Sequence, residues 1–198
     1  DGILVGSSSY ASIANRISYL FDFNGPSITL DTMCSSSLTA IYLACENIRS
    51  GATTMAVAGG VNLSIHPQKY IQLCQSGFLS TDGKCKSFGI GGDGYVPGEG
   101  VGAVLLKTLD RAVEDKDHIY GVIKGIEINA GGKVSGYTVP NQNAQKNIIL
   151  DTLSQANIDP RTISYVEAHG TGTALGDPIE INAITQSYRK FTNYCQNF

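Results

Sequence analysis

The spacing of apolar residues along the chain predicts two amphipathic helices. Across Ser35–Ile48, apolar side chains recur three and four positions apart, and Ser50-Gly51 follows as a stop signal. The same period over Ala144–Ala156 predicts a second helix, and Asn157 is placed to end it in a left-handed conformation. Each predicted helix has one apolar face that requires a partner layer.

Charged residues and a proline mark the start of a third helix. Asp177 is placed as its N-cap, Pro178 as its first residue, and Glu180 to complete a capping box. The pattern therefore predicts a helix from Asp177 to about Tyr188.

Shorter apolar or alternating segments between turn signals predict strands. These segments are Ser27–Asp31, Thr54–Ala58, Gly102–Leu106, His118–Ile128 and Ile163–Ala168. Because strands and helices alternate along the chain, the sequence favours an α/β fold with a largely parallel sheet.

Composition and charge narrow the class of protein. The chain has 198 residues, 42% hydrophobic and 16% charged, as in a globular protein. A net charge of −3 gives no basic field for nucleic acid.

Since no apolar run reaches the roughly 20 residues of a membrane helix, and Asp1 to Ser9 lack a leader pattern, we expect a cytoplasmic protein. Thr192–Phe198 show no helix or strand pattern, and we expect a fragment.

One of the five cysteines has a distinctive position. Their odd number and the lack of a C-x-x-C pair argue against a disulfide framework and a zinc knuckle. Cys34 alone lies where a predicted strand turns into a helix. The positive end of a helix stabilises a thiolate, and backbone N–H groups there can hold an oxyanion. Cys34 is therefore a candidate nucleophile, in a context that resembles the nucleophile elbow of hydrolases.

His169 is the second candidate for chemistry. It closes a predicted strand and opens the glycine-rich turn His169–Thr173, whose small residues leave room for a ligand chain. A core histidine satisfied by backbone groups is an equal reading of this residue alone. His66 and His118 lack neighbours at metal-ligand spacing, so neither predicts a metal site.

Two segments resemble the signature blocks of β-ketoacyl synthases. They are DTMCSSSL at Asp31–Leu38 and EAHGTGT at Glu167–Thr173. Between them, Asp93–Gly100 and Gly136–Asn141 resemble ketosynthase domains of modular type I polyketide synthases. GGDGYVPGEG and the triplet Thr32-Met33-Cys34 are most similar to the trans-acyltransferase subgroup.

The resemblance implies a thiolase-like fold with α/β/α/β/α layers, here incomplete at both ends. Residues 1–118 would be part of the N-terminal half of the ketosynthase domain, and 119–198 the start of its C-terminal half, in one truncated structural unit. The family's second histidine, its lysine and a further oxyanion loop belong to later motifs that this sequence does not contain. We therefore expect the fragment alone to be inactive.

The resemblance also implies a mechanism and partners. Cys34 would take an acyl group from an acyl carrier protein, and a malonyl extender would then lose carbon dioxide and attack the acyl thioester. His169 would donate to the enolate oxygen. Substrates would arrive on the carrier's phosphopantetheine arm, as in fatty-acid biosynthesis, with no directly bound cofactor or metal. A homodimer with Ser27–Asp31 near its two-fold axis is expected.

Three further residues have substrate-binding roles only by resemblance. Thr171 and Thr173 correspond to threonines that hydrogen-bond the pantetheine arm, although capping of the turn is an equal alternative. Met33 adjoins the nucleophile where an acyl chain would lie, and simple packing is an equal alternative for it.

A glycine pattern typical of nucleotide binding is also present, and two alternative functions stay open. Gly89–Gly94 match the dinucleotide pattern G-x-G-x-x-G, but Tyr95–Gly98 contain a proline and cannot open the required helix. A cysteine hydrolase with a Cys34–His169 dyad stays open, as does a non-elongating ketosynthase that only transfers acyl chains. A condensing ketosynthase is favoured because the His169 block is intact.

Overall fold

A computed structural model describes residues 9–191 of the chain. The expectations about a leader at the N-terminus and about Thr192–Phe198 lie outside this range. The chain divides into two compact units. The first unit comprises the chain up to Val61 together with Val101–Val122. The second unit comprises Asn62–Gly100 and the chain from Ile123 onward. Each unit is described by itself.

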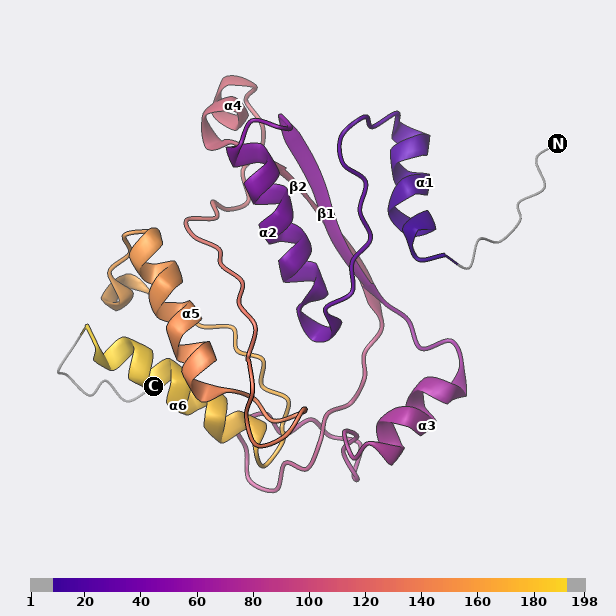
Figure 1. The fold of residues 1–198 in the computed structure, drawn as a ribbon, viewed down its shortest axis with the longest axis vertical. Coiled ribbons are helices and arrows are strands. Elements are labelled where there is room, and N and C mark those ends of the chain that lie inside the picture. Colours follow the sequence, from indigo (N-terminus) through magenta and orange to yellow (C-terminus); the bar gives the residue numbers. More distant parts are fainter. Residues whose placement is uncertain (1–8, 192–198) are drawn as a thin grey trace. The chain divides into compact units, whose positions relative to one another are not determined.

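The first unit is built from helices and the paired strands (Figure 1). Its elements are α1 (Ala11–Phe21), the 3₁₀ turn η1 (Met33–Ser35), α2 (Ser36–Arg49), β1 (Met55–Asn62), β2 (Gly100–Lys107) and α4 (Leu109–Glu114), with the last residue of β1 and the first of β2 at the boundary of the second unit. α2 lies along β1, and a Cβ atom added at Gly60 would come within 2.9 Å of the Ser37 Cβ. Ile48 and Ala58 are buried in this layer.

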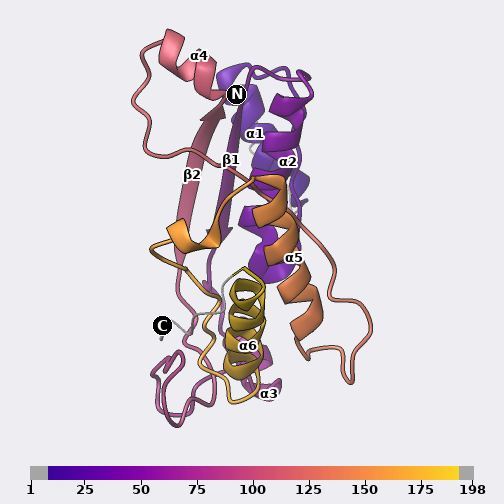
Figure 2. The same cartoon turned by 90° about the vertical axis from the view of Figure 1, so that its left-hand side faces the viewer.

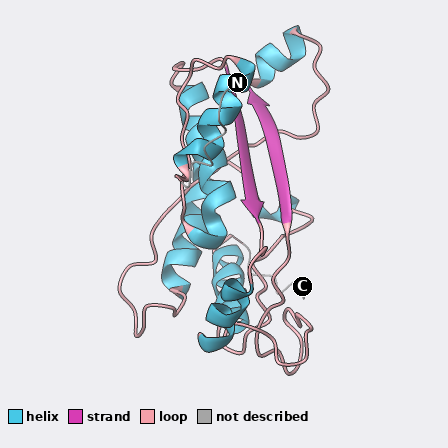
Figure 3. Ribbon diagram, turned by 90° about the vertical axis from the view of Figure 1, so that its right-hand side faces the viewer, coloured by secondary structure: helices cyan, strands magenta, loops and turns pink. Residues whose placement is uncertain are grey.

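β1 and β2 are hydrogen-bonded neighbours in a two-stranded sheet. Their arrows run in opposite directions in Figure 3, so this pair is antiparallel and not parallel as expected. The close pairing depends on glycine, because a Cβ at Gly59 would lie 2.8 Å from the carbonyl oxygen of Gly102.

The second unit is organised around two helices that pack together (Figure 2). Its elements are α3 (Pro67–Gln75), α5 (Gln142–Gln155), the 3₁₀ turn η2 (Pro160–Thr162) and α6 (Gly176–Arg189). Ala183 and Ser187 of α6 are fully buried, and the Ser187 Oγ lies 3.2 Å from the carbonyl oxygen of Lys146 on α5. Leu153 of α5 is also buried. This packing gives α6 a fixed base from which its N-terminus can hold the preceding turn.

The three predicted helices are confirmed, as α2, α5 and α6. Asn157 has a φ of 51°, which confirms the left-handed ending of α5. The strands expected at Thr54–Ala58 and Gly102–Leu106 are confirmed as β1 and β2. α1, α3 and α4 were not predicted from the sequence.

The other three expected strands, Ser27–Asp31, His118–Ile128 and Ile163–Ala168, are wrong, because the structure assigns no strand to these segments. A strand requires repeated backbone hydrogen bonds to a neighbour, and within residues 9–191 only β1 and β2 form a sheet. Their alternating pattern is therefore present without ladder pairing, although parts of these segments contact helices. Gly125, for example, lies so close to α5 that an added Cβ would be 2.8 Å from the Ala156 Cβ.

Candidate active site

Cys34 lies in η1, which leads directly into α2. Its thiol is free and its side chain is exposed. The expected placement of Cys34 at the N-terminal end of a helix is confirmed, although no strand precedes it. The positive end of a helix favours negative charge on a nearby sulfur.

Short-range hydrogen bonds hold the turn around Cys34. The Asp31 carboxylate accepts the Met33 N–H at 2.8 Å. The Ser36 hydroxyl accepts the Thr32 N–H at 2.9 Å and donates to the Met33 carbonyl at 2.7 Å. Met33 has a left-handed φ of 56°, and the residue is 76% exposed. A non-glycine residue in this region is strained, so the flanking bonds fix the backbone just before Cys34.

His169 lies on a turn that α6 holds by its backbone. The two carboxylate oxygens of Glu180 accept the N–H groups of His169 at 2.6 Å and Gly170 at 2.9 Å. Gly170 and Gly172 have φ values of 52° and 70°, which glycine adopts without steric cost. The His169 side chain itself is exposed. One carboxylate therefore fixes the backbone at the histidine.

A second carboxylate of α6 fixes the next part of the turn. Asp177 is 7% exposed, and its oxygens accept the N–H groups of Gly172 at 3.1 Å and Phe88 at 2.6 Å. The expected N-cap and capping-box roles of Asp177 and Glu180 are therefore wrong. α6 begins one residue earlier, at Gly176, and both carboxylates accept N–H groups from outside the helix. Sequence reasoning found these residues but not their partners.

The two threonines of the turn contact each other. The Oγ1 atoms of Thr171 and Thr173 lie 3.0 Å apart. The Thr173 Oγ1 also accepts the N–H of Gly176, the first residue of α6, at 3.0 Å. Of the two roles left open for Thr173, turn capping is the one that the structure records.

The structure groups the predicted residues into two sets. Met33 and Cys34 belong to the first unit, and His169, Thr171 and Thr173 belong to the second. The expectation that Cys34 faces His169 across a pocket stays a prediction. Among residues 9–191, no group of three or more His, Cys, Asp or Glu side chains is placed to hold a metal ion.

Charged side chains interact with one another in the segment around Phe88. Lys86 and Asp82 form an ion pair at 2.8 Å, and the Lys86 Nζ also donates to the Gly91 carbonyl at 3.3 Å. The hydrogen bond from Lys86 holds the pKa of Asp82 below its ordinary value, and Asp82 in turn raises the pKa of Lys86. Asp93 has a lowered pKa because the Thr81 hydroxyl donates to it.

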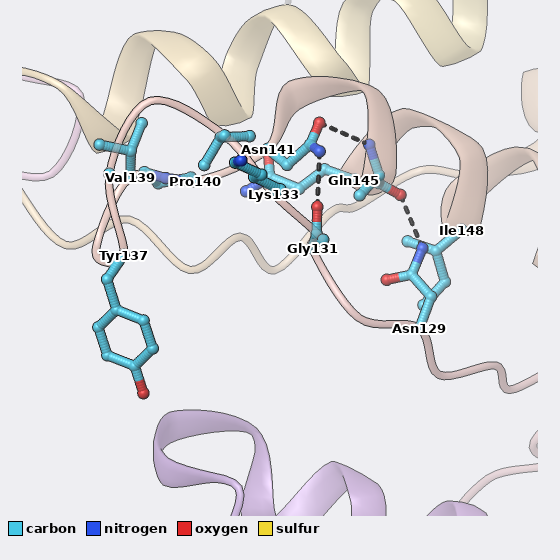
Figure 4. A pocket seen from close by; sticks show the side chains of 13 residues that line it. Asn129, Gly131, Lys133, Tyr137, Val139, Pro140, Asn141, Gln145 and Ile148 are labelled. Atoms are coloured by element: carbon cyan, nitrogen blue, oxygen red, sulfur yellow. Dashed lines mark hydrogen bonds between the residues drawn. The ribbon is translucent and has the colours of Figure 1, made fainter.

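A cavity of about 590 Å³ lies in the second unit, between the loop 129–141 and the start of α5 (Figure 4). Asn141 shapes it, because its Nδ2 donates to the Gly131 carbonyl at 2.6 Å while its Oδ1 caps the first turn of α5. Lys133 lines the cavity, and the Oε1 of Gln145 is buried without a hydrogen-bond partner. No pattern in the sequence indicates this cavity. It offers one cation and one unpaired amide oxygen.

The described helices give no sign of a membrane span, since none is both long and apolar enough to cross a bilayer.

Most of the chain is similar to a known protein family. Residues 2–112 match the family described as Beta-ketoacyl synthase, N-terminal domain, and residues 120–197 match Beta-ketoacyl synthase, C-terminal domain. Together the two matches cover most of the chain.

Curated relatives and solved structures agree with these matches. Polyketide synthase PksL of Bacillus subtilis is 64% identical over 183 residues, which are 92% of this chain and 4% of PksL. Polyketide synthase ThaG of Burkholderia thailandensis is 55% identical over 182 residues, 92% of this chain and 3% of ThaG. This chain therefore spans a small part of either relative.

Two solved ketosynthases have the same fold as this chain. An oxazolomycin ketosynthase domain of Streptomyces albus has a TM-score of 0.92 at 57% identity, over 94% of this chain and 32% of that chain. The ketosynthase from module 6 of the Bacillus subtilis bacillaene synthase has a TM-score of 0.93 at 45% identity, over 95% of this chain and 34% of that chain. The expected thiolase-like α/β fold class is confirmed.

Proposed function

Because the chain belongs to the β-ketoacyl synthase family, we propose that it forms part of a condensing ketosynthase domain of a modular polyketide synthase, in the trans-acyltransferase subgroup. The observation that carries this proposal is that the chain holds both an exposed cysteine at a helix N-terminus and a histidine on a carboxylate-held turn, each within a family signature block. Cys34 is proposed as the nucleophile, and His169 as a donor to the enolate.

The first proposed step loads an acyl chain on Cys34. The thiolate attacks the carbonyl of an acyl thioester on an acyl carrier protein, and a new carbon–sulfur bond forms as the carrier's pantetheine thiolate leaves and takes up a proton. The N–H of Cys34 itself and the positive end of α2 are proposed to stabilise both the attacking thiolate and the oxyanion that forms on the way. Met33, exposed beside Cys34, is proposed to contact the acyl chain.

The second proposed step makes the carbon–carbon bond. A malonyl thioester loses carbon dioxide, and the electron pair of the broken bond becomes an enolate. His169 donates a hydrogen bond to the enolate oxygen. The enolate carbon attacks the acyl carbonyl on Cys34, and the Cys34 thiolate leaves. Thr171 and Thr173 are proposed to contact the pantetheine arm, and the Thr173 Oγ1 also accepts the N–H of Gly176 at the start of α6.

Two substitutions in a complete ketosynthase domain that carries this chain test the proposal. Cys34→Ala should abolish loading and condensation together, because no other group can carry the acyl chain. His169→Ala should slow condensation by roughly 10²- to 10³-fold, the scale for one such donor. Loading should fall less, since the helix N-terminus acts on the Cys34 thiolate independently. Intact-mass detection of acyl-enzyme and a malonyl-dependent condensation assay measure the two steps.

The same assays separate the alternatives. Equal loss of both steps in His169→Ala would make the histidine a base that activates Cys34, as a hydrolase requires. A wild-type domain that loads but never condenses would be a non-elongating ketosynthase. We expect no condensation by the 198-residue chain alone, because the family's second histidine and lysine are not in its sequence.

Assembly and location are proposed on family grounds alone. We expect a homodimer that works in the cytoplasm with acyl carrier proteins. Analytical ultracentrifugation of the complete domain checks the dimer, and a purely monomeric species would contradict it.

A further inference from the structure

We propose that residues 85–94, which we call the supporting loop, position the turn that carries His169, with Ser87 and Gly92 as the positioning residues. This inference rests on the proposed function of His169. The supporting loop contains the G-x-G-x-x-G pattern at Gly89–Gly94, for which the sequence offered no dinucleotide role. All the contacts that carry the argument lie within the second unit.

Hydrogen bonds join the supporting loop to the His169 turn at several points. The Ser87 hydroxyl donates to the carbonyl oxygen of Gly170, the residue after the histidine. The Cys85 Sγ lies 3.6 Å from the carbonyl oxygen of Thr171. The Phe88 N–H shares the Asp177 carboxylate with the N–H of the turn's second glycine. The loop therefore contacts the carbonyl groups of the turn directly, and it shares with the Gly172 N–H the carboxylate of Asp177.

Backbone packing fixes how close the two segments lie. A Cβ added at Gly92 would overlap the carbonyl oxygen of Gly172 and come within 3.0 Å of its carbonyl carbon. On the other side, a Cβ at Gly172 would be 3.0 Å from the backbone nitrogen of Lys86. Here a glycine permits close approach to another backbone segment of the same chain. In a nucleotide-binding loop it would permit approach to a pyrophosphate.

The base of the supporting loop is itself fixed. Leu79 and Tyr95 form an isolated parallel bridge, in which the Tyr95 N–H donates to the Phe78 carbonyl at 3.0 Å. A Cβ at Gly94 would lie 2.5 Å from the Leu79 carbonyl carbon, so this base is tightly packed. A loop closed in this way can transmit a fixed position to the His169 turn.

The position of His169 therefore has two supports. α6 holds its N–H through Glu180, and the supporting loop holds the carbonyl of the next residue through Ser87. A shift of about 1 Å in a positioned group can cost about 10²-fold in rate. Loss of the second support should thus slow the step that uses His169, condensation, more than the loading of Cys34.

Gly92→Ala in the complete ketosynthase domain is the main test. The added methyl must push the supporting loop away from Gly172, and we expect condensation to fall about 10²-fold while loading changes less than about threefold. Gly98→Ala is the matched control, because a Cβ at Gly98 meets nothing within 4 Å. It should leave both steps unchanged.

A second pair of variants keeps the test valid if Gly92→Ala does not fold. Ser87→Ala removes only the hydroxyl that donates to Gly170, and we expect condensation to fall about 3- to 10-fold with loading retained. Ser87→Thr keeps a hydroxyl and should recover most of the lost rate. Ser154→Ala, on an exposed position of α5, is the control.

The outcomes separate this inference from the proposed function. Condensation that is unchanged, or lost in equal measure with loading, in both Gly92→Ala and Ser87→Ala overturns the positioning role. A wild-type domain that never acylates Cys34 contradicts the proposed function instead. Amide hydrogen exchange then decides the inference: faster exchange at Gly170 and Gly172 in Ser87→Ala supports the loop's role, and unchanged exchange overturns it.

Discussion

The turns that carry Cys34 and His169 are stabilised by different kinds of contact. Around Cys34, the bonds through Asp31 and Ser36 join residues two to four positions apart. Around His169, Glu180 lies eleven positions away and Ser87 is 83 positions from the glycine that it contacts. The first turn is set by its own short segment, whereas the second depends on two other parts of the chain.

This difference has a consequence for mutational sensitivity. A turn closed by local bonds is affected mainly by changes within it. A turn held from α6 and from the supporting loop is sensitive to residues that carry no chemistry themselves. Substitutions at four positions test this contrast in a complete ketosynthase domain.

Asp177→Ala should have the largest effect on stability. It leaves the buried N–H of Gly172 and the partly buried N–H of Phe88 without their acceptor, at a cost of about 3 kcal/mol in the free energy of unfolding. Urea unfolding measures this cost, and Asp151→Ala, at an exposed position of α5, is the control. A change no larger than the control's would show that the His169 turn does not depend on Asp177.

Glu180→Gln should have a smaller and more local effect. The amide nitrogen of glutamine cannot accept a hydrogen bond, so either His169 or Gly170 loses its partner, at a cost of about 1.5 kcal/mol. We expect faster amide exchange at these two residues and slower condensation than in wild type. Glu114→Gln, at an exposed position of α4, should alter neither. Unchanged exchange in Glu180→Gln would contradict the two-support description of His169.

The same contrast explains what the sequence could and could not predict. The helix that begins beside Cys34 follows from local periodicity and was predicted correctly, as were α5 and α6. Asp177 and Glu180 were recognised as residues near a helix start, where local rules favour capping. Their actual partners lie in other segments, and pattern within one segment contains no information about such contacts.

The strands show the same limit. Two of the predicted strands, Thr54–Ala58 and Gly102–Leu106, are present as β1 and β2. The segment His118–Ile128 alternates more strongly but forms no strand. Alternation reports which side chains face an apolar surface, but a strand also needs a neighbour with free backbone groups. In the sequence, the supporting loop matches a nucleotide-binding pattern but lacks the helix that should follow it. Its glycines instead allow close contact with a segment about 80 residues away, which the local pattern does not reveal.

Substitutions at Met33 test the local side of the comparison. Met33 has a left-handed φ of 56°, which a β-branched side chain tolerates poorly and asparagine tolerates well. Met33→Val should therefore lower the free energy of unfolding by about 1 kcal/mol, and Met33→Asn should leave it nearly unchanged. Urea midpoints of the two variants give the comparison. If the Met33→Val variant is as stable as the Met33→Asn variant, the backbone before Cys34 is not strained.

Lys86→Gln should have the smallest effect, because the Asp82–Lys86 ion pair is solvent-exposed and such pairs contribute little. The pKa of Asp82 is lowered, so its contribution is fully present above the unfolded value of about 3.9 and is lost as the pH falls through the lower folded value. The pKa of Lys86 is raised, so its contribution is present below about 10.4 and is lost as the pH rises through the higher folded value. The stability difference from wild type should therefore be flat between these limits and shrink in about 1 M salt. A difference that varies between pH 5 and pH 9 would show that a titrating group other than Asp82 also interacts with Lys86.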